Sequence, residues 1–452
     1  MSKLIGVCLA KAQSEFSREF IRNLNIRARI NDAKILVYNS ICDFTDNSNN
    51  KGARSVYYNI PYDKLSALVI LHDSICEQSL VDRIIRDSKE ANVPVIMARK
   101  YDPRCFSVIG EYIDEYTSML SKIIKEKDIK DTVFIAGRRK PEIDYDSKLR
   151  IQCYKNALED NGLKFSLDNL YFGDYWEVPA IKIVNSFLHG ERKMPEAIFC
   201  ANDSMAIAIM KFLTGSGIRI PEDVIVTGFD GLEGYIFSKP KLTTCKERMD
   251  VLCENIFNII ELTSRDKYVQ PTAYYYGYEA IFSESCGYED TTGDNWNMSR
   301  ELFDGVRYNF IDEEFTQNWY RKMIEKPSLE RFYDIIPETV NNNFCVAITP
   351  IEIAKVMMHM YHALEDNLIL FSMDTSTGLP KADRFLTKYL TPDFEQWITD
   401  DSVCYITSLF VDDNCYGVIY DRCFVPGTFG YAANRHATAL NNALLSCIKA
   451  TK

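Results

Sequence analysis

The sequence lacks the short motifs that mark the common enzyme classes. It contains no GxSxG, HExxH, Walker A or GxGxxG pattern, so nothing indicates a serine hydrolase, a zinc peptidase, a P-loop nucleotidase or a dinucleotide-dependent enzyme. No nucleophile stands with a general base in a recognisable arrangement either. We therefore expect no catalytic residue, no cofactor and no enzymatic activity in these 452 residues.

Long apolar segments and an excess of positive charge are also missing. No run of about 18 apolar residues occurs, as a membrane-spanning helix requires. The first residues, MSKLIGVCLAKAQ, lack the order of basic, apolar and small residues that defines a signal peptide. The 52 Lys and Arg are outnumbered by 64 Asp and Glu, which argues against a clustered basic face for nucleic acid. We expect a cytoplasmic protein with neither a membrane nor nucleic acid as a direct partner.

Cysteine is plentiful but carries no metal-binding or redox spacing. The fourteen cysteines run from Cys8 to Cys447 without a CxxC pair, which favours buried free thiols over disulfides or a zinc site. His359 and His362 lie three apart in an expected helix with no third ligand pattern, so we interpret them as ordinary helix positions. The basic run at residues 137–140 is interpreted as a solvated loop rather than a phosphate site. No metal is expected.

What is present is an alternation of buried strands and amphipathic helices. Apolar residues make up 46% of the chain, and its length suggests two or three domains. A first series of strands is expected at 4–9, 34–38, 67–71 and 94–98, with helices at 14–30 and 77–91. A second series has strands at 132–136, 170–172, 197–200 and 224–227, with helices at 146–161, 178–188 and from about 203. This alternation predicts α/β architecture with doubly wound parallel sheets.

Polar side chains follow two strands of the second series. Asn202 and Asp203 come after the strand at 197–200, and Phe229 and Asp230 follow the strand at 224–227. Ligands of open α/β sheets bind at the carboxyl ends of the strands, so we expect these residues to share one cleft. The alternatives are that Asn202 or Asp203 only caps the next helix, and that Asp230 is a turn residue.

Three segments carry a family resemblance. AIFCANDSMAIAIM, GIRIPEDVIVTGFDG and KPKLTT, in this order and spacing, resemble the effector-binding domain of the lactose-repressor/galactose-repressor family, whose fold is similar to that of periplasmic sugar-binding proteins. The resemblance covers about residues 3–286. It implies two lobes, at 1–108 with 241–268 and at 109–238 with 270–287, with crossings near residues 107–111 and 238–241. It also implies a cleft between the lobes that closes on a ligand.

The same resemblance implies a set of ligand-binding residues. Arg150 matches the family arginine that pairs with ligand hydroxyls, although Cys153 stands where the family usually has Gly; the alternative is a solvent-facing helix arginine. Asp230 matches the acceptor for those hydroxyls, and Tyr175 or Trp176 is placed to stack on a ring. A sugar or related polar metabolite is the implied ligand. The full expected set is Ser14, Phe16, His72, Asp73, Lys100, Tyr101, Arg150, Tyr175, Trp176, Asn202, Asp203, Phe229 and Asp230.

The pattern changes after residue 287. Residues 288–297 are polar and turn-rich, and residues 300–336 read mainly as helices, so 288–335 is expected to be a helical linker. Strands are then expected at 344–348, 368–371, 403–410 and 416–421, with helices at 351–364 and 431–449. This α+β order over 336–452 resembles a GAF-like sensory domain. Similar arrangements often precede a diguanylate cyclase with a GGDEF motif, which is absent here, so cyclase activity would belong to a parent protein.

Two functional hypotheses follow. The first is a cytoplasmic small-molecule sensor whose closure is passed through the helices at 290–335 to the C-terminal domain and an output domain, a diguanylate cyclase. The second is the sensor part of a transcriptional regulator of the same family, whose helix-turn-helix headpiece is lost or supplied by another chain, because the first strand begins at about residue 4. An enzyme on this fold lacks a nucleophile and base to support it. Family members commonly pair through their lobes, so a homodimer is expected.

Overall fold

Strands and helices alternate from the N-terminus in the computed structural model of the protein. The model describes residues 3–41, 51–75, 77–139, 143–266, 268–290, 296–357, 367–373, 377, 379–386, 397–399, 402–424 and 430–451. Residue contacts divide the chain into unit 1 (residues 1–109, 252–274 and 298–452) and unit 2 (residues 110–251 and 275–297). The division differs from the expected one: residues 241–251 belong to unit 2, whereas residues 270–274 and the C-terminal region belong to unit 1.

The N-terminal part of unit 1 is a parallel sheet. Its strands are β1 (Lys3–Ala10), β2 (Ala33–Ser40), β3 (Ala67–Leu71), β4 (Val95–Ala98) and β5 (Phe106–Glu111). Neighbouring strands pair in parallel, β1 with β2 and β3, β3 with β4, and β4 with β5. These strands are almost wholly apolar because helices cover both faces of such a sheet.

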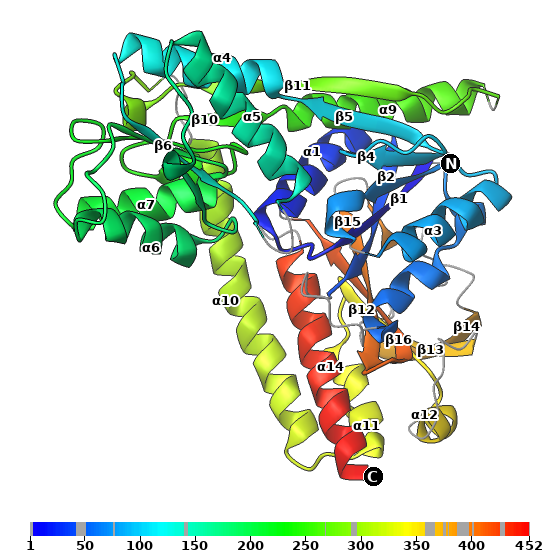
Figure 1. The fold of residues 1–452 in the computed structure, drawn as a ribbon. Coiled ribbons are helices and arrows are strands. Elements are labelled where there is room, and N and C mark those ends of the chain that lie inside the picture. Colours follow the sequence, from blue (N-terminus) through cyan, green and yellow to red (C-terminus); the bar gives the residue numbers. More distant parts are fainter. Residues whose placement is uncertain are drawn as a thin grey trace. The chain divides into compact units, whose positions relative to one another are not determined.

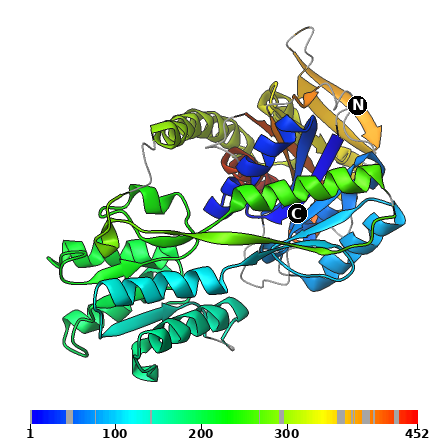
Figure 2. The same cartoon turned by 90° about the horizontal axis from the view of Figure 1, so that it is seen from above.

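The helices of this part begin and pack as their sequences indicate. They are α1 (Glu15–Ile30), the short α2 (Lys51–Arg54), α3 (Gln78–Glu90) and α9 (Met249–Arg265). Ser14 caps α1 by accepting the backbone N–H of Ser17. The unit 1 part of α9 runs beside α1, where Arg27 Nη2 lies 2.7 Å from Glu254 Oε2; Figure 2 shows the two helices, green and blue, next to each other.

The C-terminal part of unit 1 is an antiparallel sheet with helices on it. Its strands are β12 (Phe344–Ile348), β13 (Asn367–Met373), β14 (Pro380–Leu386), β15 (Val403–Val411) and β16 (Asn414–Cys423). Its helices are α10 (Trp296–Ile324), α11 (Leu329–Thr339), α12 (Ile351–Met357) and α14 (Tyr431–Thr451). The sequence did not predict β14, which begins with Pro380 and carries charged side chains. His359, His362 and Lys140 lie outside the described residues.

The two parts of unit 1 share one sheet. Strand β15 pairs in parallel with β2, from Val403 opposite Ile35 to Ile406 opposite Tyr38. The strand order in unit 1 is β5-β4-β3-β1-β2-β15-β16-β12-β13-β14, and Figure 1 shows the orange C-terminal strands continuing the blue N-terminal sheet. One hydrophobic cluster contains residues of both parts, among them Leu36, Ile406 and Tyr420. The C-terminal region is therefore packed as an extension of the first lobe, whereas its sequence pattern predicts a separate domain.

Unit 2 is built on a second parallel sheet. Its order is β7-β6-β8-β9, comprising β6 (Thr132–Ala136), β7 (Leu170–Phe172), β8 (Ala197–Cys200) and β9 (Ile225–Thr227). The helices are α4 (Ile113–Glu126), α5 (Tyr145–Asp160), α6 (Glu177–Leu188), α7 (Asp203–Gly215) and the short α8 (Gly234–Phe237). Strand β10 (Thr244–Glu247) pairs antiparallel with the unit 2 part of β11 (Ala273–Ile281). The predicted doubly wound α/β pattern is thus confirmed in this unit.

Three further features bear on function. Within the described ranges, no helix has the length and apolar character needed to cross a membrane. The cysteines that the structure describes are all buried and unbridged. In that same part of the chain, no three His, Cys, Asp or Glu side chains gather as metal ligands would.

Candidate functional site

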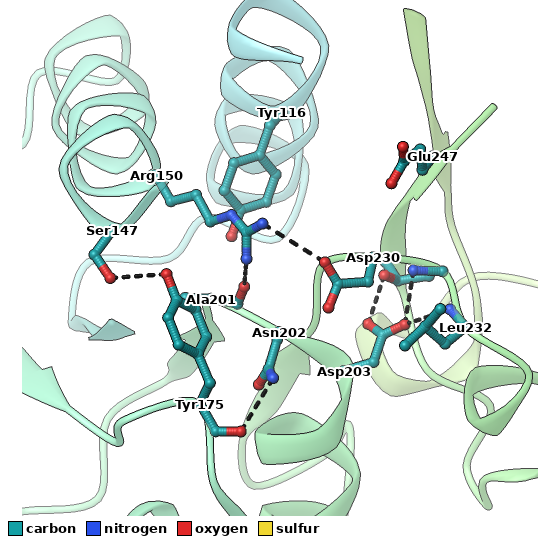
Figure 3. A network of polar contacts seen from close by, with 12 residues as sticks. Tyr116, Ser147, Arg150, Tyr175, Ala201, Asn202, Asp203, Asp230, Leu232 and Glu247 are labelled. Atoms are coloured by element: carbon teal, nitrogen blue, oxygen red, sulfur yellow. Dashed lines mark hydrogen bonds and ion pairs between the residues drawn. The ribbon is translucent and has the colours of Figure 1, made fainter. Parts of the chain in front are cut away.

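The carboxyl ends of β8 and β9 bring the expected polar residues of unit 2 together. Asn202 follows β8 and caps α7, because its Oδ1 accepts the N–H of Met205 at 3.1 Å. Its Nδ2 donates to the carbonyl of Tyr175 at 3.2 Å. Asp230, after β9, faces Arg150 across this edge of the sheet (Figure 3). Both polar atoms of the Asn202 side chain thus form hydrogen bonds within the protein. The geometry therefore shows Asn202 as a helix cap.

Arg150 reaches this edge from α5 and is 5% exposed, which excludes the solvent-facing alternative. Its Nη1 donates to the carbonyl of Ala201, and its Nη2 lies 3.6 Å from Asp230 Oδ1. Its buried Nε has no hydrogen-bond partner among the described residues. Burial alone would lower the pKa of Arg150, but Asp230, Tyr175, Tyr112 and Asp146 together outweigh burial and raise the pKa. The guanidinium is therefore a fixed cation whose buried Nε is an unused donor among the described residues.

An aromatic cluster forms the floor beneath this cation. The guanidinium carbon of Arg150 lies 3.9 Å from the ring centroid of Phe229, a cation–π distance. Phe229 is fully buried and contacts Tyr112, Tyr116 and Tyr278 at centroid distances of 5.0, 4.8 and 5.4 Å. Phe229, one of the expected ligand residues, thus packs against the guanidinium of Arg150.

Tyr175 and Trp176, which the sequence could not rank, lie in different surroundings. The hydroxyl of Tyr175 lies 2.9 Å from Ser147 Oγ and donates to Asp144 Oδ1 at 2.9 Å. Its ring covers Gly137 so closely that a Cβ there would lie 1.9 Å from the Tyr175 Cζ atom. Burial raises the pKa of Tyr175. Trp176 is 65% exposed. The ring centroid of Tyr175 lies 5.8 Å from the guanidinium carbon of Arg150, so Tyr175 is beside that cation, whereas Trp176 is mostly exposed to solvent.

Asp203 is used entirely within the protein. Its Oδ2 accepts the N–H groups of Gly231 at 2.8 Å and Leu232 at 3.1 Å, and its Oδ1 accepts the hydroxyl of Thr244 at 2.6 Å. A Cβ at Gly228 would lie 2.1 Å from Asp203 Oδ1, which explains why glycine precedes Phe229. Burial and then the charge of Asp230 raise the pKa of Asp203. Its carboxylate holds the loop that carries Asp230.

Asp230 itself has a strained backbone and an accessible carboxylate. Its φ angle is 113°, a region that residues with a Cβ rarely occupy. Two backbone bonds hold it there: its N–H donates to Cys245 O at 3.0 Å, and its own carbonyl accepts the N–H of Glu247 at 3.2 Å. Its side chain is 26% exposed, against 6% for Arg150. Strain held by surrounding contacts is typical of functional positions.

Sequence reasoning missed the residues that position Tyr175 and the β10–β11 edge. Asp144 caps α5 by accepting the N–H of Ser147 at 2.9 Å, and it also accepts the Tyr175 hydroxyl. An Asp directly before the first residue of a helix is a recognisable capping signal. Glu247, 5% exposed, accepts the hydroxyl of Tyr276. No local pattern points to that pair, because β10 and β11 meet only in the folded chain.

The expected ligand loops of unit 1 lie at the carboxyl ends of its strands. After β1, Ser14 caps α1 and the ring of Phe16 lies 4.3 Å from the guanidinium carbon of Arg99. After β3 and β4, His72 Nε2 lies 2.9 Å from Lys100 Nζ. Tyr101 is 59% exposed, and the side chain of Asp73 lies outside the described residues. Described by itself, this edge of unit 1 carries cationic and aromatic groups.

Comparison with known proteins finds similarity to part of this chain in a domain family and in several regulators. Residues 124–272 match the model of the periplasmic binding protein-like domain. The transcriptional repressor PurR of Aliivibrio fischeri is 35% identical over 118 residues, 24% of this chain and 35% of that protein. Catabolite control protein A of Priestia megaterium is 23% identical over 247 residues, 54% of this chain and 70% of that protein. The chain thus spans about a third of the length of the PurR relative.

Solved structures agree on the fold. A dimeric lac repressor bound to operator and the anti-inducer ONPF has a TM-score of 0.51 at 19% identity, covering 63% of this chain and 94% of that chain. The complex of the transcriptional regulator CelR with cellobiose has a TM-score of 0.51 at 16% identity, covering 63% and 85%. At these identities the likeness concerns the fold. The chain therefore contains a two-lobed α/β region of periplasmic-binding-protein type, similar to that of lactose-repressor-type regulators.

Proposed function

We propose that this protein is the small-molecule-sensing part of a regulator of the lactose-repressor type. The observation that carries the proposal is the buried Arg150, held over the Phe229 ring, beside the partly exposed carboxylate of Asp230. A planar donor fork next to an anionic acceptor suits a ligand with adjacent hydroxyls or a hydroxyl beside a carbonyl. A sugar or related polar metabolite has this chemistry.

The spacing of the pair supports a ligand hydroxyl that bonds to both groups. Arg150 Nη2 and Asp230 Oδ1 are 3.6 Å apart, longer than a charge-assisted hydrogen bond, which spans about 2.7–2.9 Å. A ligand hydroxyl can donate to Asp230 and accept from Arg150, so it would replace a weak direct contact with two shorter bonds. The buried Nε of Arg150 offers a further donor. The set of groups that we propose for ligand contact in unit 2 is Arg150, Tyr175, Asp230 and, at the rim, Trp176.

The nature of the output is proposed from the relatives. Those named above are a repressor, a catabolite control protein and transcriptional regulators, and the CelR structure holds cellobiose. They favour the transcriptional-regulator hypothesis over a diguanylate cyclase, because none of the relatives named above is a cyclase. The lac repressor structure is a dimer, which supports a homodimer here as part of the proposal. A GAF-like identity of the C-terminal region stays a prediction.

A thermal-shift screen of the full chain against sugars, nucleosides and amino acids tests the proposal. A ligand present at 100 times its dissociation constant adds about 2.7 kcal/mol to the free energy of unfolding. We expect cellobiose or another polyhydroxy compound to raise the melting temperature of the wild type. Arg150→Lys keeps the charge but loses the fork, so it should lose the shift. An equal shift in this variant, or no shift with any compound class, contradicts the proposal.

A further inference from the structure

The C-terminal region is fastened to the first-lobe sheet by side chains as well as by strand pairing. Ser55 Oγ lies 2.9 Å from Ser408 Oγ, and Lys34 Nζ donates to the carbonyl of Ile398 at 2.7 Å. A Cβ at Gly52 would lie 2.6 Å from the carbonyl oxygen of Asp412. With the β2–β15 pairing and a shared hydrophobic cluster, these contacts make the two parts of unit 1 one packed body.

The same body includes the loop that leads to the expected ligand residues of unit 1. Residues 11–14, here called the β1 loop, connect β1 with α1 and end at the cap residue Ser14. The strand β2 holds this loop from one side: Lys11 N–H donates to Ser40 O, and Ala12 N–H donates to Asn39 Oδ1, both at 3.0 Å. Any ligand that contacts Ser14 or Phe16 therefore acts on a loop anchored to the strand next to β15.

The start of α14 holds the β1 loop from the other side. Gly430 has a φ of +79°, and a Cβ on it would lie 2.3 Å from the carbonyl oxygen of Ala12. Tyr431, the first residue of α14, places its ring 4.6 Å from the guanidinium carbon of Arg18. Arg18 Nη1 in turn donates to the carbonyl of Gln13 at 3.2 Å. Residues 430 and 431 thus reach the β1 loop directly, although more than 400 residues separate them in sequence.

We propose that the β1 loop and the first turn of α14 form the contact through which ligand binding biases the C-terminal region. This inference rests on the proposed function, and it deepens it by naming the route. Helix α14 packs on β15, β16 and α11, and its residues Leu440, Leu444 and Ile448 belong to their common hydrophobic cluster. A shift of the β1 loop therefore changes how the first turn of α14 packs. The linker helix α10, which the sequence analysis favoured as the route, has no comparable contact with the ligand loop among the described residues.

Hydrogen–deuterium exchange on the ligand-free full chain tests the contact without a known ligand. Gly430→Ala introduces a Cβ against Ala12, and Gly190→Ala is the matched control, since Gly190 has a φ of +88° with no atom within 4 Å of the added Cβ. We expect exchange in peptides 9–18 and 431–441 to rise together in Gly430→Ala, by at least about fivefold, the lower end of typical coupling between sites. Gly190→Ala should leave both peptides unchanged. A rise confined to peptide 431–441 overturns the proposal.

A second variant, changed on the lobe side of the contact, tests the proposal if Gly430→Ala fails to fold. Asn39→Ala removes the acceptor for Ala12 N–H on the lobe side and changes no residue of α14. We expect faster exchange at 431–441 in this variant. Ser88→Ala is the control, because the buried hydroxyl of Ser88 has no hydrogen-bond partner among the described residues. Unchanged exchange at 431–441 in Asn39→Ala also overturns the proposal. If cellobiose and the other compounds prove not to bind, the proposed function fails while this ligand-free contact is judged on its own.

Discussion

Replacing Asp203 separates a structural role from a ligand-binding one. Its carboxylate accepts hydrogen bonds from Gly231 N–H, Leu232 N–H and the Thr244 hydroxyl. In Asp203→Ala the hydroxyl can turn to another acceptor, but the two backbone N–H groups cannot. An unsatisfied buried donor costs about 1–3 kcal/mol, and Leu232 N–H is only partly buried, so we expect Asp203→Ala to lose about 2–4 kcal/mol of unfolding free energy.

Asp203→Asn is the matched variant. An amide oxygen can accept both N–H groups, and the amide nitrogen can donate to the Thr244 hydroxyl with its role reversed, so all three bonds can persist. We expect this variant to stay within about 1 kcal/mol of the wild type. Urea denaturation measures the unfolding free energy of both variants. Hydrogen–deuterium exchange in peptides from β6 to β9 reports the transition of unit 2. Equal stability of Asp203→Ala and the wild type would refute the structural role.

The difference in unfolding free energy between the wild type and Asp203→Asn should depend on pH, and its sign can be derived. The pKa of Asp203 is raised in the folded state, first by burial and second by Asp230. A raised pKa means that the folded state binds the proton more tightly than the unfolded state does, so this contribution grows as the pH falls. The stability of the wild type relative to Asp203→Asn should therefore increase between about pH 7 and pH 4. A relative decrease over that range would contradict the assignment.

Two further predictions concern the Arg150 site. Gly137→Ala should displace the Tyr175 ring, because the new Cβ would lie 1.9 Å from the Tyr175 Cζ atom. We expect it to lower the unfolding free energy by about 1–3 kcal/mol and to reduce the ligand-induced thermal shift. An unaffected thermal shift would place Tyr175 outside the site. Asp230→Gly should be more stable than Asp230→Ala by about 1 kcal/mol in urea denaturation, because glycine relieves the strain at φ 113°, although both variants should lose ligand binding. The reverse order of stability would argue against strain at this position.

The sequence was sufficient for the elements that are bounded by clear signals. The predicted strands at 67–71, 132–136, 170–172, 197–200 and 344–348 have the bounds seen in β3, β6, β7, β8 and β12. Each is a short apolar run between turn residues, so burial and local turn chemistry give the same answer. Strand β14 escaped prediction because its alternating charged residues and initial proline are weak strand signals.

Long-range packing was the part that the sequence could not supply. The pairing of β15 with β2 depends on an edge strand meeting a partner more than 350 residues away, and β2 reads like any other apolar strand. One signal was present: the segment VCYITSLFV of β15 contains no charged residue, as is typical of central strands and unusual at the edge of a small antiparallel sheet. Likewise, Asp203 follows a strand as a ligand residue would, and only the folded loop at 228–232 shows where its oxygens are used.

Calorimetric titration of a compound from the thermal-shift screen into Asp230→Asn tests the central claim most directly. Asn keeps the size of the side chain but removes the charge that accepts ligand hydroxyls. Asp223→Asn, at an exposed carboxylate paired with Arg219, is the control. The account predicts one site per chain, an affinity at least about tenfold weaker in Asp230→Asn, equivalent to about 1.4 kcal/mol, and no change in Asp223→Asn. Wild-type affinity in Asp230→Asn would contradict it.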